Sequence, residues 1–188
     1  QAPEKGAQLT NCEIGDATNL NFKDETFDLA LLFGPLYHLT DKAERLKALS
    51  EAKRVLKPNG ILLTAVISRY ASLLDGFKRD LINDNIFERI LIDDLNTGIH
   101  TNSTDNLEYF TTAYFHTAEE IKDEITESNL KFDKLIAIES FGWFVDNFKT
   151  KSEDLNYMNK LRKIFNMVES NDDIISISPH IMAVAQKV

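Results

Sequence analysis

The feature that most constrains the fold is a pair of continuous apolar runs with one helical segment between them. Phe27–Phe33 is apolar except for Asp28, and Gly34-Pro35 then breaks the run. Ile61–Ile67 is the second run. Continuous apolar runs of this length are typical of strands buried on both faces, and a helix between two of them indicates a right-handed parallel crossover. The sequence therefore predicts an α/β fold built on a parallel sheet.

The segment between the two runs has the signals of a helix over Asp41–Lys57. Asp41 and Glu44 resemble a capping box at its start. Pro58 is expected to stop the helix, and Asn59-Gly60 to form the turn into the second strand. Because ligands bind beyond the carboxyl ends of the strands in open α/β sheets, the residues after Phe33 and after Ile67 are the first candidates for a site.

Further elements are expected on both sides of this unit. Thr117 and Glu120 form a second capping box, which starts a helix that runs to Ser128. The other expected elements are the end of a helix at Gln1–Gly6, a short strand at Ala7–Ile14, one or two amphipathic helices within Ser68–Phe110, a polar loop at Asn96–Asn106, an extended segment at Tyr109–Phe115, a strand at Lys134–Glu139, a helix at Glu153–Glu169 with one apolar stripe, and a last strand at Ile181–Ala185, antiparallel to the strand before it.

The length of 188 residues fits a single domain, 1–188. Residues 1–67 form a partial core, residues 68–116 a helical cap or lid inserted between regular elements, and residues 117–188 the C-terminal helices and strands. Long insertions after a strand end commonly cover a site.

Composition argues against several classes of partner. The chain has 21 basic and 30 acidic residues, a net charge of −9, which repels nucleic acid and anionic lipid. We expect neither nucleic acid nor membrane as a partner. Cys12 is the only cysteine, which fits a cytoplasmic protein without an intramolecular disulfide. No metal site is expected, because Asp93-Asp94 and His100 have the pattern of a solvated loop.

Two motifs in this first third of the chain resemble a known family. Gly15-Asp16-Ala17 precedes Phe27-Asp28 and the tract that ends Gly34-Pro35-Leu36-Tyr37-His38-Leu39. Glu51–Gly60, EAKRVLKPNG, is similar to the E-x-x-R-V-L-K-P-G-G turn, with Asn59 in place of one glycine. Order and spacing together resemble class I S-adenosylmethionine-dependent methyltransferases of the small-molecule type. The resemblance covers the second half of the family's core and its C-terminal strands.

The resemblance implies a Rossmann-like sheet and a set of cofactor contacts. Asp16 would accept a hydrogen bond from the adenine amino group, and Ala17 would offer its backbone N–H to the ring, with Gly15 beside them. Phe33, Gly34 and Pro35 would line the sulfonium side. From the residues alone, Asp16 is equally a turn residue that caps its own backbone, and Phe33 a core residue.

Catalytic and substrate-binding residues are expected at the same edge of the sheet. His38 and Tyr37 are the candidates for a general base, which a methyl transfer needs only if the nucleophile starts protonated. The residues expected to shape an acceptor pocket are Arg69, Tyr70, Tyr109, Tyr114 and His116. His180 is expected to make a structural hydrogen bond.

The family's glycine-rich cofactor loop and first two strands have no counterpart in this sequence, so we expect a truncated core. The first hypothesis is methyl transfer from S-adenosylmethionine to a small molecule. The alternative is a non-catalytic, self-associating fragment, such as a homodimer paired through the edge of Phe27–Phe33. A third option is another Rossmann-like binding protein.

Overall fold

The structure, a computed structural model, describes residues 10–188. The helix end predicted at Gln1–Gly6 and the start of the strand predicted at Ala7–Ile14 lie outside this range. Residues 10–14 form no strand, so this part of the prediction is wrong: they are exposed, and the nearest backbone bridge is the turn from Asp16 to Asn19.

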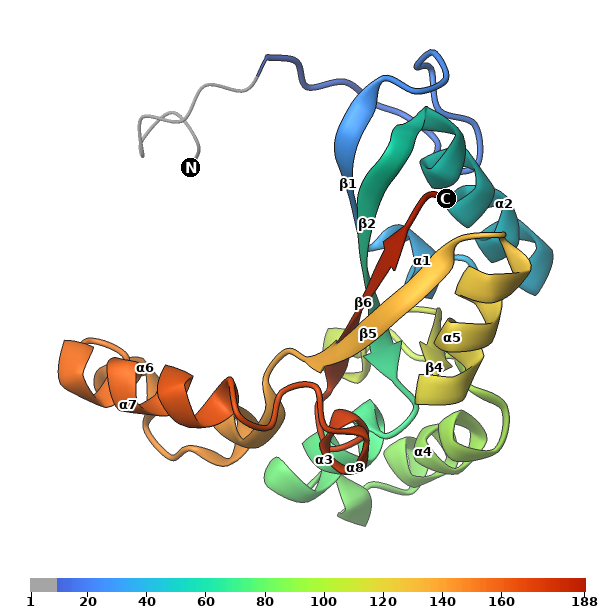
Figure 1. The fold of residues 1–188 in the computed structure, drawn as a ribbon. Helices are drawn as coiled ribbons and strands as arrows, with labels where there is room; N and C mark the ends of the chain where they lie inside the picture. The colour runs from blue at the N-terminus through green and yellow to red at the C-terminus, as the bar shows by residue number, and fades with distance from the viewer. Residues whose placement is uncertain (1–9) are drawn as a thin grey trace.

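The sheet is organised around β2 (Leu56–Ser68), which pairs with three strands. β1 (Phe27–Phe33) runs parallel to β2 along one edge, and β6 (His180–Gln186) runs antiparallel along the other. β5 (Lys131–Ala137) is antiparallel to β6 and forms the far edge. Figure 1 shows the four strands side by side. The α/β fold, the parallel pair and the antiparallel C-terminal strand are confirmed.

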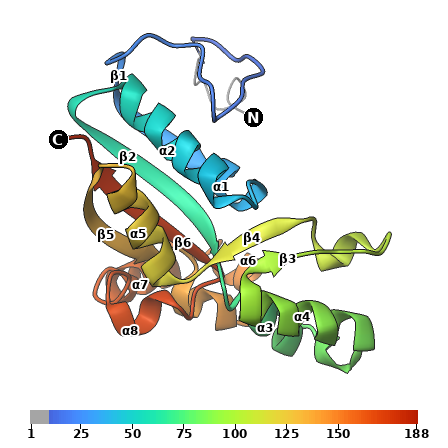
Figure 2. The ribbon, with the colours of Figure 1, turned by 90° about the vertical axis from the view of Figure 1, so that its right-hand side faces the viewer.

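β2 continues past the end of β1 and there meets the inserted segment. Its last residues, Ile67 and Ser68, pair in parallel with β4 (Ala113–His116). β4 in turn pairs with the two-residue strand β3 (Ile99–His100). Figure 2 shows this small ladder extending from the end of β2, with helices beneath it.

Helices α2 (Lys42–Val55) and α5 (Ala118–Glu127) cover one face of the sheet (Figure 1). Asp41 caps α2 by accepting a hydrogen bond from the Ala43 N–H, and Thr117 forms the predicted capping box of α5. Between this face and the helices lies the main core, whose fully buried members include Leu36, Leu49, Leu62, Ile121, Ile125 and Ile181.

The passage from α2 to β2 differs from the prediction. α2 ends at Val55 rather than Lys57, and the chain enters β2 at once. The expected Asn59-Gly60 turn becomes a bulge within β2, between the pairs Phe27↔Leu56 and Leu29↔Ile61. Asn59 has φ +65°, a left-handed conformation that asparagine tolerates better than most residues.

The opposite face of the sheet carries no helix among residues 10–188. Leu29, Leu31 and Phe33 project from β1 on this side and are 50%, 58% and 53% exposed. The prediction that β1 is buried on both faces is therefore wrong, since the described helices cover only its Ala30 and Leu32 side.

The insertion is mainly helical, as expected, with α3 (Ala71–Lys78) and α4 (Asn85–Thr97). α4 ends at Thr97 and is capped by Gly98, φ +75°, so the predicted loop at Asn96–Asn106 begins later. Short 3-10 turns occur at Leu81–Asn83, Leu107–Tyr109 and Ser140–Phe144.

After β5 the chain forms an arm of two helices, α6 (Phe148–Lys151) and α7 (Leu155–Phe165), which extends away from the sheet (Figure 1). α7 is shorter than the helix predicted at Glu153–Glu169 and contains no buried residue. α8 (Asp172–Ile175) then leads back to β6. No helix in the described part of the chain is long and apolar enough to cross a membrane.

Candidate functional site

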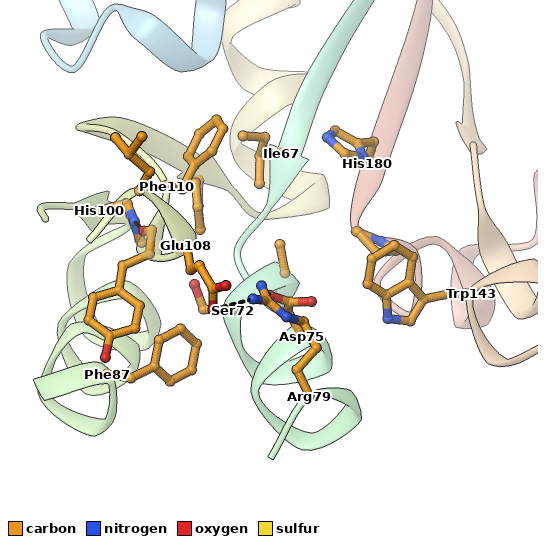
Figure 3. A pocket seen from close by; sticks show the side chains of 15 residues that line it. Ile67, Ser72, Asp75, Arg79, Phe87, His100, Glu108, Phe110, Trp143 and His180 are labelled. Atoms are coloured by element: carbon orange, nitrogen blue, oxygen red, sulfur yellow. Dashed lines mark hydrogen bonds and ion pairs between the residues drawn. The ribbon is translucent and has the colours of Figure 1, made fainter. Parts of the chain in front are cut away.

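A pocket of about 290 Å³ lies where β2 ends and β6 begins (Figure 3). Ile67 from β2 and His180 from β6 form its upper rim in this view. The opposite side is formed by Ser72 and Asp75 of α3 and by Arg79, the residue directly after α3. This position matches the carboxyl end of a parallel strand, where ligands bind in open α/β sheets.

Five aromatic side chains line the pocket. They come from the insertion and from the turn after β5: Phe87, Tyr109, Phe110, Phe115 and Trp143. Phe87 and Tyr109 lie with ring centroids 5.7 Å apart. A concave, mainly apolar cavity with a few polar groups is the usual form of a small-molecule site.

One end of the pocket is charged. The Arg79 guanidinium donates to Asp75 at 2.8 Å and to Glu108 at 3.0 Å, so it links α3 to the turn that carries Tyr109. Asp75, foremost by its hydrogen bond, raises the pKa of Arg79. The guanidinium therefore stays charged beside the aromatic wall.

A buried hydrogen-bond network holds the wall in place. Asp94 of α4 accepts from the Ser72 hydroxyl, and its Oδ2 lies 2.8 Å from His100 Nδ1. His100 Nε2 lies 2.6 Å from the Tyr109 carbonyl oxygen and donates to it. His100 also stacks on Phe115 with centroids 4.8 Å apart. Asp94 and His100 are buried, so the prediction of a solvated loop is wrong here.

The sequence did contain a signal for Asp94. The buried side chains of α4 are Phe87, Ile90, Leu91 and Asp94, at positions i, i+3, i+4 and i+7. An aspartate on the apolar stripe of a helix is buried and needs a partner, which His100 and Ser72 supply.

His180 and Glu139 form a pair at the rim of the pocket. His180 Nδ1 lies 2.6 Å from Glu139 Oε1, and Glu139 Oε2 accepts from the His180 backbone N–H and the Ser178 hydroxyl. Burial alone would raise the pKa of Glu139, but the hydrogen bonds from His180 and Ser178 outweigh it, so the pKa is lowered. The structural hydrogen bond expected of His180 is present.

A second polar cluster, separate from the pocket, joins α2, β4 and α5. Arg45 and Glu124 form a buried ion pair at 2.7 Å, and His116 Nε2 donates to Glu124 at 3.2 Å. Arg69 pairs with Glu120, and the Tyr114 hydroxyl donates to Glu120.

Burial sets the charge state of this cluster. Desolvation lowers the pKa of His116, so the imidazole is neutral. Burial opposes ionisation of Glu124 as well, but hydrogen bonds from His116 and Arg45 prevail and lower its pKa. The Arg45 guanidinium also lies 3.7 Å from the centre of the Tyr114 ring. The cluster therefore contains compensated charges, with little room for a ligand.

The predicted acceptor residues are thus divided between two places. Tyr109 lines the pocket, whereas Arg69, Tyr114 and His116 belong to the buried cluster. Tyr70 is half-exposed at the start of α3 and lines no described pocket.

The predicted catalytic residues lie in α1 (Pro35–His38), the single turn of helix after β1. His38 is exposed and lines no described pocket, and its ring lies 4.7 Å from that of Tyr37. Tyr37 packs against the small core cluster of Ile67, Ala113 and Phe115, of which Ile67 and Phe115 also line the pocket. α1 therefore contacts the pocket wall through Tyr37.

The predicted cofactor residues occupy two segments. Phe33 is half-exposed, Gly34 has φ +129°, and Pro35 begins α1. Gly15 and Asp16 lie exposed in the turn before β1. Two hydrogen bonds from Thr18, through its backbone N–H and hydroxyl, lower the pKa of Asp16.

Ala17, next to this turn, packs against the main core. No hydrogen bond or described pocket joins this turn to Phe33–Pro35.

Comparison with solved structures identifies the fold. A SAM-dependent methyltransferase from Methanosarcina mazei matches with a TM-score of 0.55 at 17% identity, covering 94% of this chain and 66% of that one. A SAM-dependent methyltransferase from Thermotoga maritima matches with a TM-score of 0.53 at 18% identity, covering 100% and 67%. The chain has the fold of class I S-adenosylmethionine-dependent methyltransferases.

Sequence comparison also finds similarity to methyltransferases, mainly in the first third of the chain. Residues 1–64 match the family model described as a methyltransferase domain. The human "Probable tRNA methyltransferase 9B" is 39% identical over 62 residues, covering 32% of this chain and 14% of that protein. "Ubiquinone/menaquinone biosynthesis C-methyltransferase UbiE" of Ruegeria sp. (strain TM1040) is 36% identical over 89 residues, covering 46% and 34%. The chain therefore spans less than two thirds of these relatives.

Proposed function

We propose that this protein transfers the methyl group of S-adenosylmethionine to a small molecule bound in the pocket at the end of β2. The pocket is the observation that carries this proposal, because it combines aromatic walls with a volume of about 290 Å³ at the ligand-binding edge of the sheet. Cys12, exposed and unpaired with another cysteine, supports a reducing, cytoplasmic setting.

The residues at the end of β1 fit the sulfonium side of the cofactor. Gly34, at φ +129°, leaves its backbone accessible without a Cβ, and the half-exposed Phe33 ring offers a π face to a cation. Pro35 fixes the first turn of α1 beside them. When bound, S-adenosylmethionine supplies a methyl group on an already activated carbon.

Asp16 fits the adenine side. Thr18 occupies Oδ1 only, and the lowered pKa keeps the carboxylate an acceptor, so Oδ2 can receive a hydrogen bond from an amino group. Gly15 and the Ala17 backbone would lie along the adenine ring. The reaction itself needs mainly proximity and alignment, which the pocket and the end of β1 would supply.

Isothermal calorimetry with S-adenosylmethionine tests the cofactor part of this proposal. We expect saturable binding, and a loss of about tenfold in affinity for Asp16→Ala, because this variant removes a hydrogen bond from the adenine amino group to a charged acceptor. Glu13→Gln, a neighbouring exposed carboxylate, is the control. A folded protein that gives no heat contradicts the proposal.

Methyl transfer to two classes of acceptor tests the substrate part. Several relatives are named as tRNA methyltransferases, whereas the net charge of −9 opposes binding to RNA. Labelled S-adenosylmethionine is therefore offered with small aromatic compounds and, separately, with bulk tRNA. Transfer to tRNA alone would exclude the small-molecule acceptor.

One observation favours a second function, a self-associating domain without catalysis. Leu29, Leu31 and Phe33 form an exposed apolar row on β1, a strand with an unpaired outer edge within residues 10–188. Such an edge can pair with a second copy. Sedimentation should show a dimer that Leu31→Lys dissociates and Asp28→Lys leaves intact. A monomer at high concentration would exclude this function.

A further inference from the structure

We propose that His180 is the general base of the methyl transfer, that Glu139 is its positioning residue, and that the acceptor is a phenol. This inference rests on the proposed function and assigns the substrate class to the same pocket. His180 lies at the start of β6, opposite Ile67 of β2, so its side chain projects from the same face as Ile67. Figure 3 shows both at the rim of the pocket.

The hydrogen bonds of Glu139 determine which ring nitrogen of His180 carries the proton. Glu139 is ionised and can only accept, so the nitrogen 2.6 Å away, Nδ1, must donate. Nε2 is then left with a free lone pair, and no described residue hydrogen-bonds to it. A carboxylate that fixes the tautomer in this way leaves the second nitrogen of a pocket-lining histidine able to accept a proton, which a general base needs.

Glu139 is itself held rigidly. Its Oε2 accepts from the Ser178 hydroxyl at 2.9 Å and from the His180 backbone N–H at 3.0 Å. The Ser178 hydroxyl oxygen accepts from the backbone N–H groups of Glu139 and Ser140. The His180–Glu139 pair is therefore fixed at the start of β6. The imidazole is oriented before an acceptor binds.

The other three histidines of the chain do not offer this geometry. His38 is exposed and lines no described pocket. Both ring nitrogens of His100 are engaged, one with Asp94 and one with the Tyr109 carbonyl oxygen. His116 is fully buried against Glu124 and lies outside the pocket. His180 combines access to a cavity with an available lone pair, and its side chain is 42% exposed.

The walls of the pocket indicate an aromatic acceptor. Phe110, Phe115 and Trp143 present rings to the cavity, and aromatic groups pack favourably against such walls. A base contributes only when the nucleophile carries a proton that must leave. An aromatic hydroxyl meets both conditions.

Methyl transfer to the phenol is a single displacement at the methyl carbon. His180 Nε2 accepts the phenolic proton while an oxygen lone pair forms the new bond to the methyl carbon. The bond between that carbon and sulfur breaks, and its electron pair stays on sulfur. The products are an aryl methyl ether, a neutral thioether and an imidazolium, which returns its proton to solvent.

Comparing two phenols distinguishes base catalysis by His180 from a merely structural role of this residue. 4-Nitrophenol is already ionised in mildly alkaline buffer, whereas 4-methylphenol is not. His180→Ala should lower kcat/KM for 4-methylphenol about 100-fold, within the usual range for loss of a general base, and change that for 4-nitrophenol less than about fivefold. Added imidazole should restore part of the activity with 4-methylphenol.

Glu139→Gln tests positioning in the same assay. It should lower kcat for 4-methylphenol with little change in KM. For 4-nitrophenol, both kcat and KM should stay almost unchanged. Glu153→Gln, an exposed carboxylate that lines no described pocket, is the matched control and should leave the kinetic constants for both phenols unchanged. An equal loss for both phenols in His180→Ala, or no loss at all, would overturn the assignment of the base.

Two further readouts distinguish failure of this inference from failure of the proposed function. Trp143, the single tryptophan of the chain, lines the pocket, so its fluorescence should be quenched by 4-nitrophenol. Calorimetry reports cofactor binding independently. If S-adenosylmethionine binds but no phenol is methylated, the phenol and the base are wrong and another acceptor is required. If S-adenosylmethionine does not bind, the proposed function fails. If 4-nitrophenol does not quench the fluorescence of Trp143, phenols do not bind in the pocket, and this inference fails.

Discussion

Asp94 has no contact with solvent, and two segments depend on its carboxylate. Asp94→Asn replaces one acceptor oxygen by an amino group that faces a donor, so a buried hydrogen bond is lost and polar groups remain unsatisfied. We expect the free energy of unfolding to fall by about 2 kcal/mol, measured by urea denaturation. Asp93→Asn, the exposed neighbour, should change it by less than about 0.5 kcal/mol. Equal effects would contradict the role of the network.

The residues around the pocket were anticipated only in part. Tyr109, expected to shape an acceptor pocket, lines the pocket at the end of β2, and its role in binding stays a prediction. Asp94 and His100 were interpreted as solvated because the position of Asp94 on the apolar stripe of α4 was overlooked, and because Ser72 and the Tyr109 carbonyl oxygen, their other partners, lie in separate segments. His180 lies at the pocket because β6 pairs with β2, more than a hundred residues earlier in the chain. No local sequence pattern predicts this pairing.

Arg45 connects α2 to the chain that leaves α1. It pairs with Glu124 of α5 and donates to the carbonyl oxygens of Leu39 and Thr40. Arg45→Ala leaves the Glu124 charge buried with only the neutral His116 to donate to it, and we expect a loss of about 3–5 kcal/mol in the free energy of unfolding.

Lys42→Ala breaks the exposed pair of Lys42 with Glu127 on the same two helices, and should lower the melting temperature far less than Arg45→Ala, because solvent screens an exposed pair. Thermal denaturation of both variants measures the difference. Similar melting temperatures would show that the buried pair contributes no more than the surface pair.

Glu51 and Arg54 attach the segment before β1 to α2. Glu51 accepts from the Leu20 N–H, and Arg54 donates to the carbonyl oxygens of Leu20 and Phe22. The Arg54 hydrogen bond lowers the pKa of Glu51 from 4.5 to about 2. A folded-state pKa below the unfolded value means that this stabilisation is complete above pH 4.5 and is lost as the pH falls toward about 2.

The amide resonance of Leu20, followed by NMR during an acid titration, should report this attachment. We expect its shift to move with a midpoint of about 2, the pKa of Glu51. Glu51→Gln should abolish this titration, and Glu44→Gln, on the same helix, should preserve it. A midpoint near 4.5 would indicate that Glu51 is not attached in solution.

The helices and strands with strong local signals were predicted well. The capping residues Asp41 and Thr117 start α2 and α5 as expected, and the apolar runs become β1 and β2. The bulge at Asn59 could not be foreseen, because the same residues suit a turn or a bulge and only the pairing with β1 decides between them. Burial of β1 on both faces was inferred from composition, but it requires covering helices that the described residues do not supply.

The arm of α6 and α7 should be the least stable part of the described molecule. α7 has no buried residue, whereas α5, of similar length, buries Ile121, Glu124 and Ile125. Helices derive most of their stability from packing, so the amides of α7 should exchange with deuterium much faster than those of α5. Equal protection would show that a partner or a second copy covers the arm in solution.

The position of β6 has a consequence for biosynthesis. β6 is synthesised after all the other described strands, yet it lies between β2 and β5 and pairs with both. Until it leaves the ribosome, those two strands have no neighbour between them, and His180 is missing from the pocket. The early parallel unit can form while the chain is still attached, but the sheet closes only after β6 emerges. Assembly of the site should therefore be among the latest steps of folding.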